Sequence, residues 1–342
     1  MVCKARKEAR KLMALPHAAR QSVLHAIASA LMERSDEILE ANQLDLEAGE
    51  TNSISASLLN RIKITPEKLK ALEAGIHQLA DLDDQLGLVR SKRELADGLE
   101  LSLVTVPIGL LMVIFEARPE SLAQIVALAL TSGNGLLLKG GKDAACSNEA
   151  LHNVIGDAIE IGSNGEITRD IIGLVTSRRQ VQELLSMDDA IDLVIPRGSN
   201  EFVAYVKANT HIPVLGHADG VCHVYVDKSA SEADACKVVV DAKTDYPASS
   251  NAMDTLLLHK DTLKNGVALH VLQALRSNHV KCLGGAKAMS AGLCDVMTKN
   301  KHHEYEDLIC LVEIVDGIDE AIDWIHENGS GHTETIVCAD TD

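Results

Sequence analysis

Aromatic residues are scarce in this sequence, making up 2% of its 342 positions. The core must therefore be built from Leu, Ile, Val and Ala. The Gly and Pro contents are ordinary, which excludes fibrous and disordered classes. A chain of this length that is 46% hydrophobic can form a sizeable core and two domains.

Positive charge is also in deficit, and the formal net charge is −18 at pH 7. An acidic surface repels phosphate backbones, so nucleic acid is not an expected partner. A nucleotide cofactor is not excluded, because a local pocket can still be positive. The sequence has no apolar run of membrane-spanning length, so no membrane association is expected. The longest runs, 110–115 and 125–130, are separated by Glu116, Arg118 and Glu120.

Paired cysteine motifs are absent as well. None of the eight cysteines forms a C-x-x-C pair and their spacing fits no zinc module, so no metal site is expected. Without a signal peptide, free thiols in a reducing, cytoplasmic compartment are the default. The basic segment 1–10 could be a targeting peptide, but Glu8 within it favours a surface helix of the domain.

Hydrophobic periodicity predicts an α/β fold. Residues 1–80 are expected to form helices, as the apolar face of Val23, Ile27 and Leu31 illustrates. The alternation of Leu99, Leu101 and Leu103 with polar residues predicts a half-buried strand. Further strands are expected at 110–115, 136–139, 171–175, 191–195 and 212–215, with helices at 121–130, 144–159, 179–185 and 200–208.

Apolar strands that alternate with amphipathic helices indicate a parallel sheet covered on both faces. A second run of this kind begins near residue 221, with strands at 223–226 and 255–259 and helices at 232–244 and 263–276. We therefore expect a domain boundary near residues 216–222, dividing the chain into 1–218 and 219–342.

Three segments follow predicted strands, and ligands of parallel sheets bind beyond the carboxyl ends of strands. They are Lys139-Gly140-Gly141-Lys142, Pro196-Arg197-Gly198-Ser199 and Glu116-Ala117-Arg118-Pro119. Glycines let backbone N–H groups approach an anion, and a following helix N-terminus adds positive potential. Neither glycine segment is a G-x-G-x-x-G or Walker motif. Plain strand-to-helix turns and a dinucleotide site both remain open on this reasoning.

Long segments of the chain resemble γ-glutamyl phosphate reductase, also called glutamate-5-semialdehyde dehydrogenase, of the aldehyde dehydrogenase superfamily. The resemblance covers nearly the whole chain and is nearest to the reductase half of bifunctional pyrroline-5-carboxylate synthases. The segments that carry it are PIGLLMVIFEARPESLAQIVALALTSGNGLLLKGGK (107–142), AIDLVIPRGSN (190–200), IPVLGHADGVCHVYVD (212–227), DAKTDYPASSNAMDTLLLH (241–259) and HEYEDLI (303–309).

The resemblance implies an aldehyde dehydrogenase fold with NADP bound by residues 1–218 and a catalytic domain in 219–342. It also implies proline biosynthesis chemistry, the NADPH-dependent reduction of γ-glutamyl 5-phosphate to glutamate 5-semialdehyde and phosphate. In the family a cysteine thiolate attacks the acyl phosphate, and the resulting thioester accepts hydride. Passing through a thioester replaces one hard step with two easier ones.

Site residues follow from the resemblance position by position. Lys139 matches the lysine on the adenosine ribose, and Gly140, Gly141 and Lys142 match the phosphate-side turn, where Lys142 suits the extra phosphate of NADP. The second cofactor loop corresponds to Pro196, Arg197, Gly198 and Ser199. Glu304 matches the glutamate on the nicotinamide ribose, although a solvated charge is the alternative for Glu304 and Lys142. Arg118 is assigned to substrate or oxyanion contact.

The nucleophile segment departs from the family. The family's YPAACNAM is YPASSNAM here, which places Ser250 at the position of the catalytic cysteine, with Asn251 a weaker candidate beside it. An alcohol without a dedicated base is a poor nucleophile, and its ester accepts hydride less readily than a thioester. None of the eight cysteines is expected to lie near this motif and replace it. An engineered inactive form and a naturally impaired enzyme are both consistent with Ser250.

The family continues beyond the segment SGHTE (330–334) with further strands and a tail that helps subunits associate. Relative to it, the fold is expected to be truncated at Asp342, with exposed sheet edges and a weakened homo-oligomer. A hairpin near 99–106 is expected to support the remaining subunit contact. The predicted assembly is a weak dimer or an aggregating monomer.

Two other functions remain alternatives. The first is a catalytically inactive nucleotide-binding or regulatory homologue. The second is an ordinary aldehyde oxidiser. It is less favoured because such enzymes need a base for thioester hydrolysis, and the stretch 215–220 contains no Glu.

Overall fold

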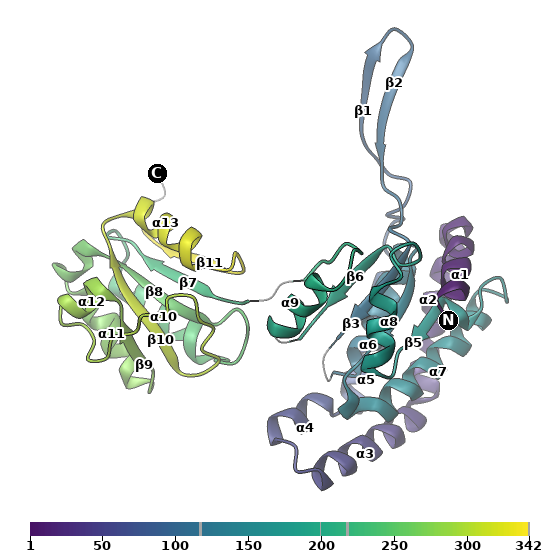
Figure 1. Cartoon of the computed structure of the whole chain (residues 1–342), viewed down its shortest axis with the longest axis horizontal. Coiled ribbons are helices and arrows are strands. Elements are labelled where there is room, and N and C mark those ends of the chain that lie inside the picture. Colours follow the sequence, from purple (N-terminus) through teal and green to yellow (C-terminus); the bar gives the residue numbers. More distant parts are fainter. Residues whose placement is uncertain (116–117, 199, 217–218, 341–342) are drawn as a thin grey trace. The chain divides into compact units, whose positions relative to one another are not determined.

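The computed structural model describes residues 1–115, 118–198, 200–216 and 219–340. The chain divides into two compact units, unit 1 (Met1–Ala218) and unit 2 (Asp219–Asp342). Each unit contains one parallel sheet with helices packed on it (Figure 1). The predicted α/β fold is confirmed.

Unit 1 begins with five helices, followed by a hairpin and an alternating α/β segment. The first helices are α1 (Val2–Ala14), α2 (His17–Glu33), α3 (Ser35–Thr51), α4 (Ala56–Ile62) and α5 (Pro66–Ala80). The hairpin strands are β1 (Val89–Ala96) and β2 (Leu99–Val104). The rest comprises β3 (Leu110–Ile114), α6 (Glu120–Thr131), β4 (Gly135–Lys139), α7 (Ala145–Gly162), β5 (Ile172–Leu174), α8 (Arg178–Leu185), β6 (Leu193–Pro196) and α9 (Asn200–Ala208).

The sheet of unit 1 has the order β5-β4-β3-β6, and all its strands are parallel. Successive side chains of a strand point to opposite faces of the sheet. Helices cover both faces, so both sets of side chains are buried. Leu111 and Val113 of β3 pack with α2, α5, α6 and α7, whereas Leu110 and Met112 pack with α1 and α8. The basic N-terminal segment is therefore a packed helix, with Ala5 and Leu12 of α1 completely buried.

The β1–β2 hairpin is antiparallel and extends away from the sheet and helices of unit 1 (Figure 1). The expected half-buried strand at this position is wrong, because every residue of both strands is exposed. The alternating Leu99, Leu101 and Leu103 are 56%, 56% and 63% exposed. The periodicity correctly indicated an apolar face, but nothing in the described part of unit 1 covers it.

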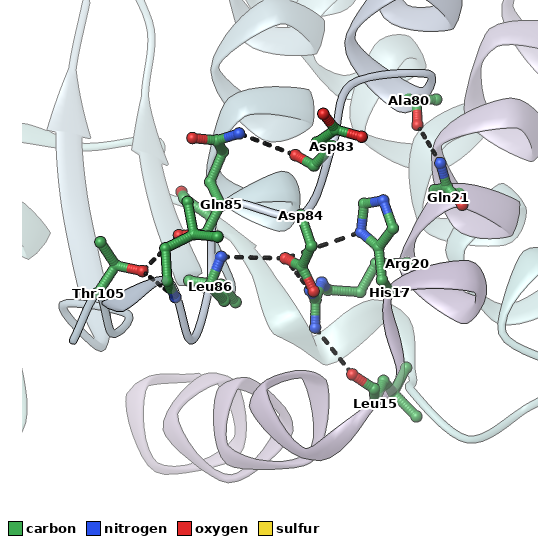
Figure 2. A network of polar contacts seen from close by, with 12 residues as sticks. Leu15, His17, Arg20, Gln21, Ala80, Asp83, Asp84, Gln85, Leu86 and Thr105 are labelled. Carbon is green, nitrogen blue, oxygen red and sulfur yellow. Dashed lines mark hydrogen bonds and ion pairs between the residues drawn. The ribbon is translucent and has the colours of Figure 1, made fainter. Parts of the chain in front are cut away.

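A buried arginine anchors the base of this hairpin (Figure 2). The Arg20 guanidinium, 4% exposed, donates to both carboxylate oxygens of Asp84 at 2.6 and 2.7 Å and to the carbonyl of Leu15 at 2.8 Å. The other strand joins through the Thr105 hydroxyl, which donates to the Gln85 carbonyl at 2.6 Å. Bidentate, partly buried pairs of this kind are strong, so the point at which the hairpin leaves unit 1 is fixed.

Unit 2 alternates strands with helices from its start. Its elements are β7 (Cys222–Val226), α10 (Glu232–Thr244), β8 (Met253–His259), α11 (Val267–Ser277), β9 (Lys281–Gly284), α12 (Ala286–Ser290), β10 (Ile309–Val315), α13 (Ile318–Asn328) and β11 (Glu334–Val337). The sheet order is β11-β7-β8-β10-β9, all parallel. Leu256 and Leu258 face α10 and α11, whereas Leu257 packs on the other face with Trp324 of α13.

The predicted elements differ from the observed ones mainly at their ends, where caps and packing decide the boundary. The strand expected at 212–215 is wrong, because only an isolated bridge between Val194 and Val214 forms there. Pro213 lies inside this segment, and proline cannot donate to a neighbouring strand.

Candidate active site

The candidate cofactor residues of unit 1 follow the carboxyl ends of three neighbouring strands. Arg118 comes after β3, Lys139 ends β4 and Pro196 ends β6. Because these strands are parallel neighbours, the segments that follow them lie along one edge of the sheet. The structure thus groups Arg118, the Lys139–Lys142 turn and the Pro196–Gly198 turn, whereas Ser199 lies outside the described residues.

Lys139 is half-buried, and its ammonium donates to the Gly140 carbonyl. Burial and the neighbouring Arg178 guanidinium lower its pKa. Arg178 is the first residue of α8, the helix that follows β5, and β5 is the strand next to β4. Both Arg178 and Lys142 are exposed. No carboxylate pairs with Lys142 or Arg178 within the described residues. Three cations therefore lie at the ends of β4 and β5 with their charge available to an anion.

Arg178 is a residue that the sequence prediction missed, since the helix was expected to begin at Arg179. The signal was present in Ser177 and Gln180, which form a capping box and place Arg178 at the first helical position. The capping box also means that the α8 N-terminus is already satisfied. Arg178 contributes through its side chain, not through the helix end.

A side chain at Gly140 would press on two neighbouring side chains. A Cβ atom there would lie 2.4 Å from Nδ2 of Asn148 and 3.0 Å from the Phe115 ring. Gly141 has ordinary extended backbone angles. Gly140 thus lets the turn lie close to α7 and to Phe115, which follows β3.

The expectation that the helix after this turn offers its N-terminus to an anion is wrong. The carboxylate of Asp45 on α3 accepts hydrogen bonds from the Cys146 amide at 3.0 Å and the Ser147 amide at 2.8 Å. It also accepts from the Ser147 hydroxyl at 2.6 Å. The first-turn donors of α7 are therefore already bonded to an internal anion, which offsets the positive end of the helix.

The second turn is held by β3. The Arg197 amide donates to the Ile114 carbonyl at 2.8 Å, which extends the β3–β6 pairing by one residue, and the Arg197 side chain is exposed. Gly198 has φ +155°, and a Cβ there would lie 3.2 Å from the Phe202 ring of α9. The turn therefore presents Arg197 beside the start of α9.

Arg118 has an exposed side chain with no bonded partner among the described residues. Its carbonyl accepts from the Ser121 amide at 3.0 Å, which begins α6. Glu116 and Ala117, which precede it, lie outside the described residues.

In unit 2, Ser250 lies in a turn between α10 and β8. The Ser249 amide donates to the Tyr246 carbonyl at 3.0 Å, and the Ala252 amide donates to the Ser249 carbonyl at 2.9 Å. The Ser250 side chain is exposed. The Asn251 side-chain oxygen accepts from the Ser249 hydroxyl at 2.5 Å, which leaves the Asn251 NH₂ as the free donor of that side chain.

Gly220 brings Ser250 and Glu304 together. Its amide donates to Oε2 of Glu304 at 3.2 Å. A Cβ at this position would lie 2.4 Å from the Ser250 carbonyl oxygen, 3.0 Å from the Ser250 Cβ and 3.1 Å from Oε1 of Glu304. Glu304, which is 84 positions from Gly220 in the sequence, and Ser250 thus both approach a glycine that has no room for a side chain.

A cysteine does lie beside this turn, so the expectation that none does is wrong. The Cys222 thiol donates to the Ser250 carbonyl at 3.2 Å and lies 3.6 Å from Nδ1 of His332. Adjacent strands β7 and β8 bring these distant segments together. Burial raises the pKa of the Cys222 thiol to about 11, and the side chain is 2% exposed. A protonated, enclosed thiol is not a nucleophile, so Cys222 does not replace the missing cysteine.

Ser250 has no base to activate it among the described residues. No imidazole or carboxylate there hydrogen-bonds its hydroxyl. No group of three or more His, Cys, Asp or Glu that could hold a metal ion occurs in the described ranges. A serine in this position has the location of a nucleophile without its activation.

Among the helices of the described segments, none is long and apolar enough to cross a bilayer.

Comparison with known proteins places these features in a family. Residues 1–268 match the profile described as the aldehyde dehydrogenase family. The chain is 44% identical over 336 residues to γ-glutamyl phosphate reductase of Synechococcus elongatus, covering 98% of this chain and 77% of that protein. It is 48% identical over 342 residues to Δ1-pyrroline-5-carboxylate synthase B of Arabidopsis thaliana, covering 100% of this chain and 46% of that protein.

The structural comparison agrees. The crystal structure of γ-glutamyl phosphate reductase from Thermotoga maritima matches with a TM-score of 0.93 at 31% identity, covering 99% of this chain and 82% of that one. The chain spans about half the length of the synthases it matches, 46% in the Arabidopsis case.

Proposed function

Because the chain belongs to the aldehyde dehydrogenase family and, within it, to the γ-glutamyl phosphate reductases, we propose that its site is built for NADPH-dependent reduction of γ-glutamyl 5-phosphate. The products are glutamate 5-semialdehyde and phosphate. The observation that carries the proposal is the meeting of Ser250 with Glu304 at Gly220, since a nucleophile and a ribose-binding carboxylate must lie together.

The residues fit a nicotinamide dinucleotide, which family membership implies. Lys139, Lys142 and Arg178 have no carboxylate partners in the described residues, as a phosphate-binding edge requires. Arg197 offers a further exposed cation at the start of α9. Because Asp45 occupies the α7 N-terminus, we assign the pyrophosphate to the Arg197–Gly198 turn and the extra phosphate of NADP to Lys142 and Arg178. We assign Lys139 as the ribose contact of unit 1 and Glu304 as the ribose contact of unit 2, each considered within its own unit.

Two bonds to the acyl carbon form and two break. The nucleophile at position 250 attacks this carbon, and the bond to phosphate breaks, which leaves an acyl-enzyme. When bound, NADPH would supply the hydride to the acyl carbon, and breaking the bond between this carbon and residue 250 would release the aldehyde and free the side chain. Arg118 and the NH₂ of Asn251 are the donors we assign to the substrate and to the developing oxyanion.

We propose that the chain as it stands is impaired in forming the bond between the side chain of residue 250 and the acyl carbon. Ser250 has no base, and its ester would accept hydride less readily than a thioester. This same observation favours the second candidate, a nucleotide-binding homologue without turnover. The two are separated by a reductase assay run in reverse, with pyrroline-5-carboxylate, phosphate and NADP, on the chain and on Ser250→Cys. Gain of activity supports an impaired enzyme, whereas a silent Ser250→Cys protein that binds NADPH supports the second candidate.

We also propose that the exposed hairpin mediates contact with a second copy of this chain. Its apolar face of Leu99, Leu101 and Leu103 is exposed, and apolar strand faces are normally covered. Leu101→Arg should shift the oligomer towards monomer by light scattering. An unchanged mass would exclude this face as the contact.

A further inference from the structure

One carboxylate lies beneath the candidate catalytic turn. Asp254 follows Ser250 by four residues, on a β8 strand of which every residue is buried, and it is 2% exposed. Its Oδ1 accepts from the Tyr305 amide at 2.9 Å, and its Oδ2 accepts from the Cys222 amide at 3.4 Å. A charged group in an apolar strand is costly unless it is bonded, and this one is bonded on both oxygens.

The two amides belong to the segments that build the site. Tyr305 directly follows Glu304. Cys222 lies two residues after Gly220, whose amide donates to Glu304. The Cys222 thiol donates to the Ser250 carbonyl. Asp254 therefore ties the Glu304 segment and the Gly220 segment to the strand that begins at the Ser250 turn.

The counter-ion comes from the helix that leads into the same turn. Lys243 of α10 is completely buried, and its Nζ lies 3.9 Å from Oδ1 of Asp254. Lys243 lies on the same buried face of α10 as Ala235 and Val239. It places a cation at a position where an apolar side chain is expected. Lys243 Nζ has no hydrogen-bond partner in the described residues.

This pair is a poor choice for stability alone. Burial lowers the pKa of Lys243 and raises that of Asp254, so each group loses solvation. At a separation of 3.9 Å, the attraction between two buried charges offsets less of their desolvation cost than in a closer pair. Replacing a buried ion pair with apolar residues is often neutral or stabilising. What the pair does supply is a fixed acceptor for two amides of the site.

We propose that Asp254, with Lys243 as its counter-ion, is a positioning residue that sets Glu304 and the Ser250 turn at their working separation. The inference deepens the proposed function, since it rests on Glu304 as a cofactor-ribose ligand. Asp254 touches neither substrate nor cofactor. It acts through the backbone of Tyr305 and Cys222.

The sequence carried a signal for both residues that the site prediction did not use. Lys243 stands at i+4 and i+8 from Val239 and Ala235 on a helix face that is otherwise apolar. Asp254 stands in the apolar run Met253–His259. A charge at a core position is a functional candidate whenever it has a partner of opposite sign.

The test compares Asp254→Asn with a matched core variant. Asparagine has the same shape, but its NH₂ replaces one carboxylate oxygen, so a donor faces one of the two amides that now donate to different oxygens. Val271→Ala on α11 removes apolar packing from the core of the same unit without changing a hydrogen-bonding group, and it gives a destabilised control. If Asp254→Asn does not fold, Lys243→Met is used in its place, because it removes the cation that lies nearest the Asp254 carboxylate.

Two readouts are measured on each folded protein. The first needs no ligand and follows amide hydrogen exchange at Cys222 and Tyr305. We expect exchange at these two amides to accelerate at least about tenfold in Asp254→Asn and to change far less in Val271→Ala. The second is calorimetric affinity for NADPH, expected to fall about tenfold in Asp254→Asn and to stay unchanged in Val271→Ala.

Equal effects of the two substitutions on exchange and affinity would overturn the inference, because Asp254 would then be a plain core residue. Loss of protection at Cys222 and Tyr305 with unchanged NADPH affinity would also overturn it. If the unmodified chain binds no NADPH, the proposed cofactor site fails, and the exchange readout alone decides whether Asp254 holds the two segments.

Discussion

The candidate residues of the two units differ in their surroundings. In unit 1 the candidate residues are long cations at the sheet edge, and Lys142, Arg178 and Arg197 have no acidic partner in the described residues. In unit 2 they are small or enclosed groups, and Gly220, Ser250 and Glu304 sit in a closed set of backbone contacts. Open charge suits a polyanionic ligand, whereas closed contacts suit the accurate placement of a reacting atom.

The treatment of negative charge follows the same division. In unit 1, the Asp45 carboxylate accepts hydrogen bonds from amides in the first turn of α7. These bonds stabilise the unit and leave that helix end unavailable to a phosphate. In unit 2, Asp254 holds the two segments that meet at Ser250. The net charge of −18 does not by itself prevent a local anion site, because Lys142, Arg178 and Arg197 lie at the same sheet edge without acidic partners in the described residues.

The comparison predicts that glycine is less replaceable in unit 2. Gly220→Ala places a Cβ 2.4 Å from the Ser250 backbone oxygen, which cannot move without displacing the turn. Gly140→Ala meets the Asn148 side chain, which can shift. We expect Gly220→Ala to lower the free energy of unfolding of its unit by about 3 kcal/mol and Gly140→Ala by about 1 kcal/mol. Denaturant titration measures both, and a larger loss for Gly140→Ala would break the comparison.

Neutralising single cations in unit 1 should weaken binding without affecting stability. Lys139→Ala and Arg178→Ala should each reduce NADPH affinity by about 1–3 kcal/mol in calorimetry, because each removes a charge-assisted contact. Arg178→Ala should in addition lose more affinity for NADPH than for NADH. Arg179→Ala, one position further along α8, is the matched control, since that side chain pairs with Glu183. Equal losses in Arg178→Ala and Arg179→Ala would remove Arg178 from the site.

A smaller effect is expected from pH at the Glu304 segment. Hydrogen bonding to the Asn328 carbonyl, together with the Asp219 carboxylate, raises the pKa of His302 above 6.5. A raised folded-state pKa means that this stabilisation is complete below pH 6.5 and is lost as pH rises through the raised value. The melting temperature should therefore fall slightly between pH 6 and pH 8.5, and less so in His302→Asn. His326→Gln on α13 is the control, and the same pH slope in all three proteins would exclude His302.

The sheets were predictable from the sequence because their strands are buried on both faces. Runs such as 110–114 and 135–138 contain no polar side chain, which is the pattern of a parallel strand. The position of Lys139 and Pro196 at the carboxyl edge then follows from the alternation of strands and helices. The family resemblance, borne out by the comparisons, supplied the rest of the fold.

What could not be predicted depends on contacts between distant segments. Asp45 caps residues about a hundred positions away, and Cys222 meets Ser250 only because β7 and β8 are neighbours. The alternation of Leu99, Leu101 and Leu103 specifies an apolar face but not what covers it. A strand pattern carries no information on whether its cover lies in the same chain.

The central claim is that Ser250 occupies a nucleophile position from which only the reactive atom is missing. The direct measurement is the NADP-linked reductase rate of the chain and of Ser250→Cys, in reducing agent because Cys222 lies beside the turn. Cys222→Ala in the same background excludes a contribution from that thiol. We predict little or no turnover for the chain and a rise of at least about a thousandfold with Ser250→Cys, because a thiolate forms near neutral pH. A normal enzymatic rate for the unmodified chain, or an inactive Ser250→Cys protein that folds and binds NADPH, would contradict the claim.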